Sequence, residues 1–107
     1  MAIAIEDIAR ELKVAPGTLV RQSVLAYIAQ QERLARGDIS DLADRYRVAT
    51  VSELREAVSR GQVYGHPAWE DAIEWEHLEA YLGQLKELRS RVRSSAAPVG
   101  SSDAPAI

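Results

Sequence analysis

The sequence predicts an all-α protein of four to five helices, in which a short N-terminal helical hairpin precedes a long C-terminal helix. Two observations support this fold class. Apolar residues recur at spacings of three and four along separate segments, and glycine or proline stands where most of these segments end. With 107 residues, of which 47% are apolar, the chain is long enough to bury one modest core.

The N-terminal hairpin is expected over residues 1–37, as an element for dimerisation or DNA contact. Its first helix covers residues 5–14, and one face of that helix is apolar: Ile5, Ile8, Ala9 and Leu12. The helix should end at Pro16-Gly17, because proline disfavours the helical conformation of the residue before it.

The second helix of the hairpin is expected from about Leu19 to Arg36. Thr18 is its predicted N-cap and Gly37 its C-terminal stop. The side chains that share one side of this helix are Val20, Val24, Tyr27, Ile28, Gln31 and Leu34.

Two shorter helices are expected next. The first runs from Asp38 to about Arg47. Thr50 and Glu53 then have the spacing of a capping box, in which each side chain accepts a hydrogen bond from a free amide at a helix start. This helix should stop at Gly61 and bury Val51, Leu54 and Val58.

The last helix, from about Pro67 to Arg93, has two apolar faces. One carries Trp69, Ala72, Ile73 and Ala80. The opposite face carries Leu78, Tyr81, Leu82, Leu85, Leu88 and Val92, with Trp75 at its margin. The second face has a coiled-coil spacing, and the short helices expected before it leave no element to cover it. Residues 38–93 are therefore interpreted as a partner-binding region, and residues 94–107, rich in Ser, Ala and Pro, as a disordered tail.

Composition excludes several functional classes. The chain has no cysteine, and it has no apolar run close to the roughly 20 residues that span a membrane. We therefore expect a cytoplasmic protein that has neither disulfides nor a membrane span. No nucleophile, base and oxyanion site converge in the sequence and no glycine-rich phosphate loop occurs, so neither an enzyme nor a cofactor is expected.

The first two helices resemble a helix-turn-helix, and also the helical pair of ribbon-helix-helix proteins. Lys13 stands where the turn usually has glycine, and Gln22 stands where the second helix is usually apolar. Two interpretations stay open, a hairpin used for packing and a DNA reader. The DNA reader would require an oligomer, because the net charge is −3. Its exposed DNA contacts would be Lys13, Thr18, Arg21 and Gln22.

Residues 69–82 carry five acidic groups and no basic one. Glu74 and His77 have the Glu-x-x-His spacing of carboxylate-bridged metal sites, which an oligomer with Glu70 as an extra ligand would have to complete. The alternative is a solvated acidic face with a surface histidine. Trp69 is expected to anchor the helix to the core, whereas Trp75, beside the uncovered face, requires a neighbour. An aromatic anchor ringed by acidic charge is typical of a surface that binds a basic protein.

Several segments together resemble small prokaryotic antitoxins of toxin–antitoxin pairs: residues 11–14 leading into 19–28, 51–58 with Gly61, and 66–71. The resemblance implies a C-terminal region that binds and neutralises a toxin, often a basic ribonuclease. Its toxin-facing residues would be Trp69, Trp75, Leu78, Tyr81, Leu82, Leu85 and Leu88. We therefore expect a homo-oligomeric, cofactor-free interaction module. A dimeric DNA-binding regulator is the first alternative, and an oligomer-completed metal site is the second.

Overall fold

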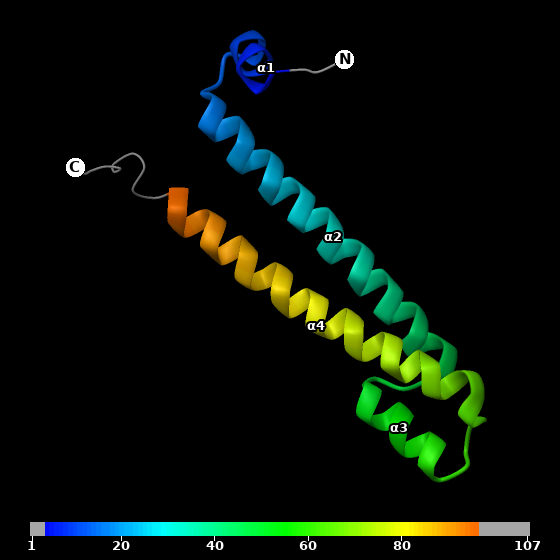
Figure 1. Ribbon diagram of the computed structural model, residues 1–107. Helices are drawn as coiled ribbons and strands as arrows, with labels where there is room; N and C mark the ends of the chain where they lie inside the picture. Colours follow the sequence, from blue (N-terminus) through cyan, green and yellow to red (C-terminus); the bar gives the residue numbers. More distant parts are fainter. Residues whose placement is uncertain (1–3, 97–107) are drawn as a thin grey trace. The chain divides into compact units, whose positions relative to one another are not determined.

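The computed structural model describes residues 4–96, which form four helices and no strand (Figure 1). They are α1 (Ile5–Leu12), α2 (Pro16–Tyr46), α3 (Val51–Ser59) and α4 (Gly65–Ala96). The predicted all-α class is therefore confirmed over these residues. The chain divides into two compact units. Unit 1 is Met1–Gln30 with Lys86–Ile107, of which residues 4–30 and 86–96 are described, and unit 2 is Gln31–Leu85.

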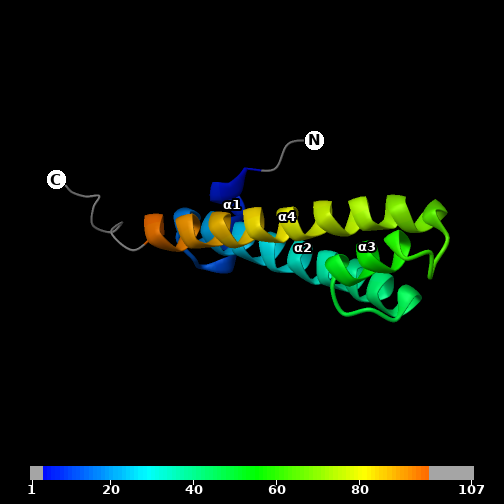
Figure 2. The same ribbon diagram turned by 90° about the horizontal axis from the view of Figure 1, so that it is seen from below.

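Unit 2 contains the larger apolar core. The end of α2, the whole of α3 and the start of α4 pack together there, and both views show α3 beside the start of α4 (Figures 1 and 2). Leu54 of α3 is 0% exposed and Trp75 of α4 is 1% exposed, so these two large side chains fill the centre. The buried core residues are Leu42, Leu54, Ala68, Ala72 and Trp75.

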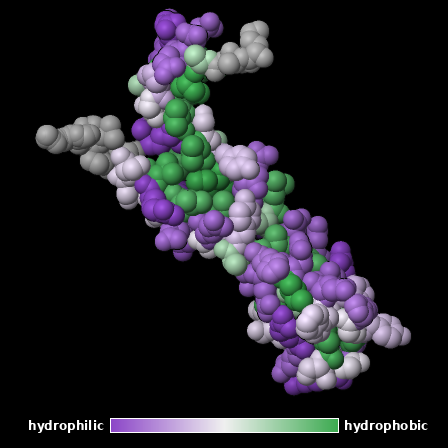
Figure 3. Space-filling view, in the orientation of Figure 1, coloured by the Kyte–Doolittle hydropathy of each residue, from purple (hydrophilic) through white to green (hydrophobic). Residues whose placement is uncertain are grey.

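Unit 1 combines α1 with the first part of α2 and the last part of α4. Its fully buried apolar residues, among those described, are Ala9 and Ile28. Several of its larger apolar side chains stay exposed, and Figure 3 shows apolar residues gathered on one face of this unit. Unit 1 thus buries less apolar surface than unit 2, and burial of such surface is the main driving force of folding.

Local hydrogen-bond motifs determine where several of the helices begin and end. The predicted capping box is present: Glu53 N–H donates to Thr50 Oγ1 at 3.1 Å, and Ala49 N–H donates to Glu53 Oε1 at 2.8 Å. Three helices end in a left-handed residue, Lys13, Arg47 or Gly61, and in each case the next amide bonds back five residues. This is the Schellman motif, which satisfies carbonyls left free at a helix end.

The main correction concerns Gly37. The separate helices expected over 19–36 and 38–47 are one continuous helix, α2, so the stop at Gly37 was wrong, and residues 4–96 form four helices, the lower number of the expected four to five. One glycine inside a helix costs only about 1 kcal/mol, which packing of the rest of α2 outweighs. Thr18 also lies inside α2 and does not cap it, because Leu19 N–H already bonds to Ala15 O.

Two smaller boundaries also differ. The first helix stops at Leu12, because Lys13 takes a left-handed conformation. The last helix extends to Ala96, so residues 94–96 are helical and not part of a tail. The rest of the expected tail, residues 97–107, lies outside the described residues.

Candidate partner-binding surfaces

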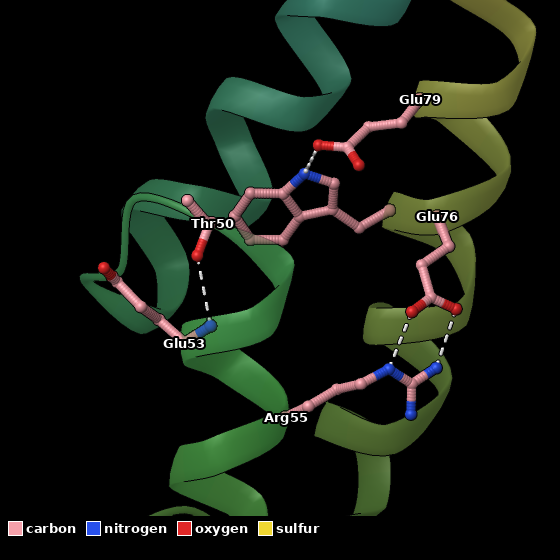
Figure 4. A network of polar contacts seen from close by, with 6 residues as sticks. Thr50, Glu53, Arg55, Glu76 and Glu79 are labelled. Atoms are coloured by element: carbon pink, nitrogen blue, oxygen red, sulfur yellow. Dashed lines mark hydrogen bonds and ion pairs between the residues drawn. The ribbon is translucent and has the colours of Figure 1, made fainter.

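Trp75 lies inside unit 2 and not at the margin of an uncovered face. Its indole packs against Leu42 and Leu54 in the core cluster, and its Nε1–H donates to Glu79 Oε2 at 3.1 Å, one helical turn away (Figure 4). The indole proton, which must find a partner when buried, is thereby satisfied. The expectation that Trp75 needs a neighbour from outside the chain is corrected: the chain supplies that neighbour.

The second apolar face of α4 is also covered by the chain itself. Leu85 is buried, and Leu78 packs against the core of unit 2. The hydroxyl of Tyr81 donates to Gln31 Oε1 of α2 at 2.9 Å, while Leu82 and Leu88 are half-buried. The face was expected to be uncovered because α2 was divided at Gly37. A continuous α2 provides a long partner helix.

Trp69, in contrast to the buried Trp75, is exposed. It was expected to anchor α4 to the core, but 55% of its surface is exposed. It lines a hollow of about 290 Å³ between α3 and α4, together with Arg55, Val58, Ser59 and Ala72. Ala68 and Ala72, small residues on the same helix, occupy the buried positions instead. Their size lets α3 approach α4 closely, and the larger indole remains outside.

Most carboxylates of the acidic run have partners within unit 2. Asp71 accepts hydrogen bonds from the Tyr46 hydroxyl and from Arg45 Nη1, the latter at 2.8 Å. The hydrogen bond to Asp71 raises the pKa of Arg45. Burial raises the pKa of Tyr46, and the hydrogen bond to Asp71 raises it further. The carboxylate of Asp71 therefore joins the end of α2 to the start of α4.

Arg55 and Glu76 form a second link, between α3 and α4. The guanidinium donates two hydrogen bonds of 2.7 Å to the two carboxylate oxygens (Figure 4). Such two-point pairs have the best geometry among ion pairs. The hydrogen bond from Arg55 lowers the pKa of Glu76. Of the five acidic residues in the run 69–82, only Glu74 forms no side-chain hydrogen bond or ion pair within residues 4–96.

The carboxylates around Glu74 line a second hollow of unit 2, of about 330 Å³. Asp38, Asp41 and Asp71 share it with Glu74 and with Arg45. Within the described part of the chain, no group of three or more His, Asp or Glu side chains has the arrangement of a metal site. In the expected metal set, Glu70 lies 3.3 Å from Nδ1 of His66, while Glu74 and His77 are exposed.

The residues expected to contact DNA lie at the junction of α1 and α2. Lys13 and Gln22 are exposed, whereas Thr18 and Arg21 are half-buried. Lys13 has a φ of 63°, the left-handed conformation that a glycine would adopt there. Lys13 thus ends α1 in the conformation for which glycine is the usual residue, as Arg47 and Gly61 do after α2 and α3.

Sequence reasoning missed the roles of Arg45, Tyr46 and Arg55. These side chains pair with acidic residues 21 to 26 positions away in the chain, and no local spacing reveals such pairs. It also missed that Val20, Val24 and Tyr27 stay exposed, although their spacing along one side of the helix was recognised.

For residues 4–96, no helix is both long enough and apolar enough to cross a membrane.

Comparison with known proteins gives one match. Residues 1–94 match the family described as "Uncharacterized protein MJ0235 family". No curated protein and no solved structure matches the chain. The match covers all four helices except the last two residues of α4.

Proposed function

Because the chain belongs to this uncharacterised family, which assigns no activity, we propose from the surface of unit 2 that the protein is a non-catalytic module that binds a basic partner protein. The observation that carries the proposal is Trp69, an exposed indole beside a hollow between two helices. Tryptophan is among the residues most enriched at binding hot spots. Because other residues fill the core of unit 2, the exposed indole of Trp69 is available to contact a partner.

The hollow beside Trp69 supports recognition of an inserted side chain. Val58 and Ala72 supply an apolar floor, and Arg55 with its partner Glu76 supplies a fixed polar rim. Apolar centres with polar rims are the usual anatomy of protein–protein interfaces. An aliphatic or aromatic side chain from a partner would pack on the indole and enter this hollow.

The charge of unit 2 supports a basic partner. Residues 31–85 contain six basic and eleven acidic side chains, a net charge of −5. Such a field attracts a basic surface and raises the rate of association. The resemblance to antitoxins adds a mode of action: by covering the basic active surface of a toxin, for instance a ribonuclease, the module would neutralise it without any chemistry of its own.

The test compares two baits. The wild-type chain and Trp69→Ala are immobilised in equal amounts, and bound proteins from the source cells are compared. A protein retained by the wild type is then purified and titrated. We expect Trp69→Ala to lose at least about tenfold in affinity, which is about 1.4 kcal/mol, and Trp69→Phe to lose less. Gln84→Ala, at an exposed position of α4 that does not line the hollow, is the control. Equal retention of the same proteins by both baits would contradict the proposal.

A second candidate function rests on the turn at Lys13. Its left-handed backbone supports a helix-turn-helix in which the first residues of α2 approach DNA. Under this alternative, the protein binds duplex DNA with an affinity that falls steeply as salt rises. Lys13→Ala and Arg21→Ala should each weaken binding to a random-sequence duplex, measured by fluorescence anisotropy. Binding that survives both substitutions together would exclude this candidate.

A further inference from the structure

One side of α4 stays largely open in unit 2, whose residues 31–85 are all described. Ala72 and Trp75 face the core, and each is 1% exposed. Trp69, Ile73 and Ala80 lie roughly a third of a turn further round the helix. Trp69 and Ala80 are exposed, and Ile73 is half-buried outside the core cluster. These three residues form the open face of α4, which presents apolar side chains that the core does not use.

The spacing along the open face suits a second helix. Positions 69, 73, 76 and 80 repeat at intervals of four, three and four, the pattern by which helices pack in a coiled coil. Glu76 stands at one of these positions, and two hydrogen bonds of 2.7 Å from Arg55 offset its charge (Figure 4). The four positions span about 17 Å, which is three helical turns. A straight, partly apolar face of this length fits the apolar side of a partner helix.

The charge beside the open face is of one sign. Residues 61–85 contain five acidic residues and no Lys or Arg. Glu70 and Glu74 are exposed and directly follow Trp69 and Ile73, so they lie along one edge of the open face. Neither forms an ion pair with a Lys or Arg within residues 4–96. A partner that carries positive charge along the same edge is therefore complementary.

We propose that the segment of the partner that binds unit 2 is a basic amphipathic helix, which lies along α4 from Trp69 to Ala80. A large apolar side chain of that helix enters the hollow beside Trp69, and its Lys or Arg residues meet Glu70 and Glu74. Helices bind in this way when one apolar side enters a groove. The inference rests on the proposed function, because it specifies the chemistry of the partner at the same site.

The first test uses two synthetic peptides of about 18 residues, long enough to form a helix. Both consist of Leu, Ala and Lys in the same numbers. One has Leu at spacings of three and four, and the other has the same residues in scrambled order. Each is titrated into the full chain labelled with ¹⁵N. We expect the amphipathic peptide to bind at least about tenfold more tightly and to shift the amides of residues 69–80 and the indole N–H of Trp69.

The second test places a positive charge on the open face. Ala80→Lys should weaken binding of the amphipathic peptide and of the captured partner at least about tenfold, because its ammonium group meets the basic residues of the partner helix. Ser40→Lys is the matched control, since it adds the same charge at an exposed helical position of unit 2. Lysine is a good helix former, so both variants should keep the circular dichroism of the wild type.

Four outcomes would overturn the inference. Equal affinity for the two peptides would mean that charge alone explains binding. The absence of binding, or shifts confined to residues outside 69–80, would also contradict it. Shifts of residues 69–80 that appear when the free chain is concentrated would assign the open face to a second copy.

The variants separate this inference from the proposed function. If Trp69→Ala loses the captured partner while Ala80→Lys binds it as tightly as Ser40→Lys, the proposed function stands and the helix along α4 is wrong. If Trp69→Ala retains the same partner, the proposed function itself is wrong, whatever the peptides do.

Discussion

At the scale of single residues, unit 2 is held together by carboxylates paired with side chains from other helices. Asp71 joins Tyr46 and Arg45 of α2 to α4, and Glu76 joins Arg55 of α3 to α4. Sequence composition presented these acids as an acidic face. In the structure they connect elements, because each lies opposite a donor from another helix.

The hydrogen bond from Tyr46 to Asp71 should contribute measurably to stability. Tyr46→Phe removes the donor and leaves a largely buried carboxylate with one fewer partner, so we expect a loss of about 1.5 kcal/mol in the free energy of unfolding. The raised pKa of Tyr46 means that this contribution is present below the ordinary tyrosine value of 10.0 and is lost as pH rises through the folded pKa. Urea unfolding measures it. Tyr64→Phe, whose hydroxyl is in solvent, should change nothing, and an equal loss in both variants would contradict the role of Asp71.

The pair of Arg55 and Glu76 should give the protein an acid-sensitive contribution. The pKa of Glu76 is lowered in the folded chain, so the contribution is present above its ordinary value of 4.5 and is lost as pH falls through the lowered folded pKa. Glu76→Gln should therefore be less stable than wild type at pH 7, and the difference should close in strong acid. Thermal unfolding at both pH values checks this, and a difference that persists in strong acid would rule out the ion pair as its cause.

At the scale of elements, the length of α2 decides the fold. Its continuity through Gly37 gives α4 a partner helix, and the Gln31–Tyr81 hydrogen bond and the burial of Leu42 against Trp75 follow from it. The local sequence instead predicted a helix end at Gly37, because glycine is the usual residue just after a helix end. A glycine by itself does not show whether tertiary packing will stabilise a helix that continues through it.

Gly37 offers a direct check of this point. A Cβ at residue 37 meets nothing within 4 Å, so Gly37→Ala should raise the free energy of unfolding by about 1 kcal/mol through lower backbone entropy in the unfolded chain. Gly61→Ala is the matched control: its φ of +72° is strained for alanine, so stability should fall. If Gly37→Ala destabilised the protein, a continuous α2 in solution would be wrong.

How far the sequence predicts the structure varies with the range of the interaction. The Thr50–Glu53 box and the turn at Gly61 were predicted correctly, because their hydrogen bonds lie within a few residues. The burial of the two tryptophans was predicted the wrong way round: Trp69 was expected in the core and is exposed, whereas Trp75 was expected beside an uncovered face and is buried. Both tryptophans lie on the same amphipathic helix. Trp75 is buried because it packs against Leu42 of α2 and Leu54 of α3. That choice depends on contacts far apart in sequence, as does the pairing of the acidic run.

At the scale of the whole molecule, the two units differ in character. Unit 2 is acidic, has the larger core and presents Trp69, while unit 1 is weakly basic and exposes an apolar helix face. Neither surface carries convergent catalytic groups among the described residues. The surface of unit 2 that presents Trp69 is the one that we propose binds a basic partner.

The most direct test of the proposed function uses the two tryptophans as internal reporters. Acrylamide quenching of fluorescence should resolve one accessible indole, Trp69, and one protected indole, Trp75, in the free protein. In the complex with the captured basic partner, the accessible component should disappear. If the accessible component persists in a saturated complex, Trp69 is not the anchor and the binding function proposed for unit 2 is wrong.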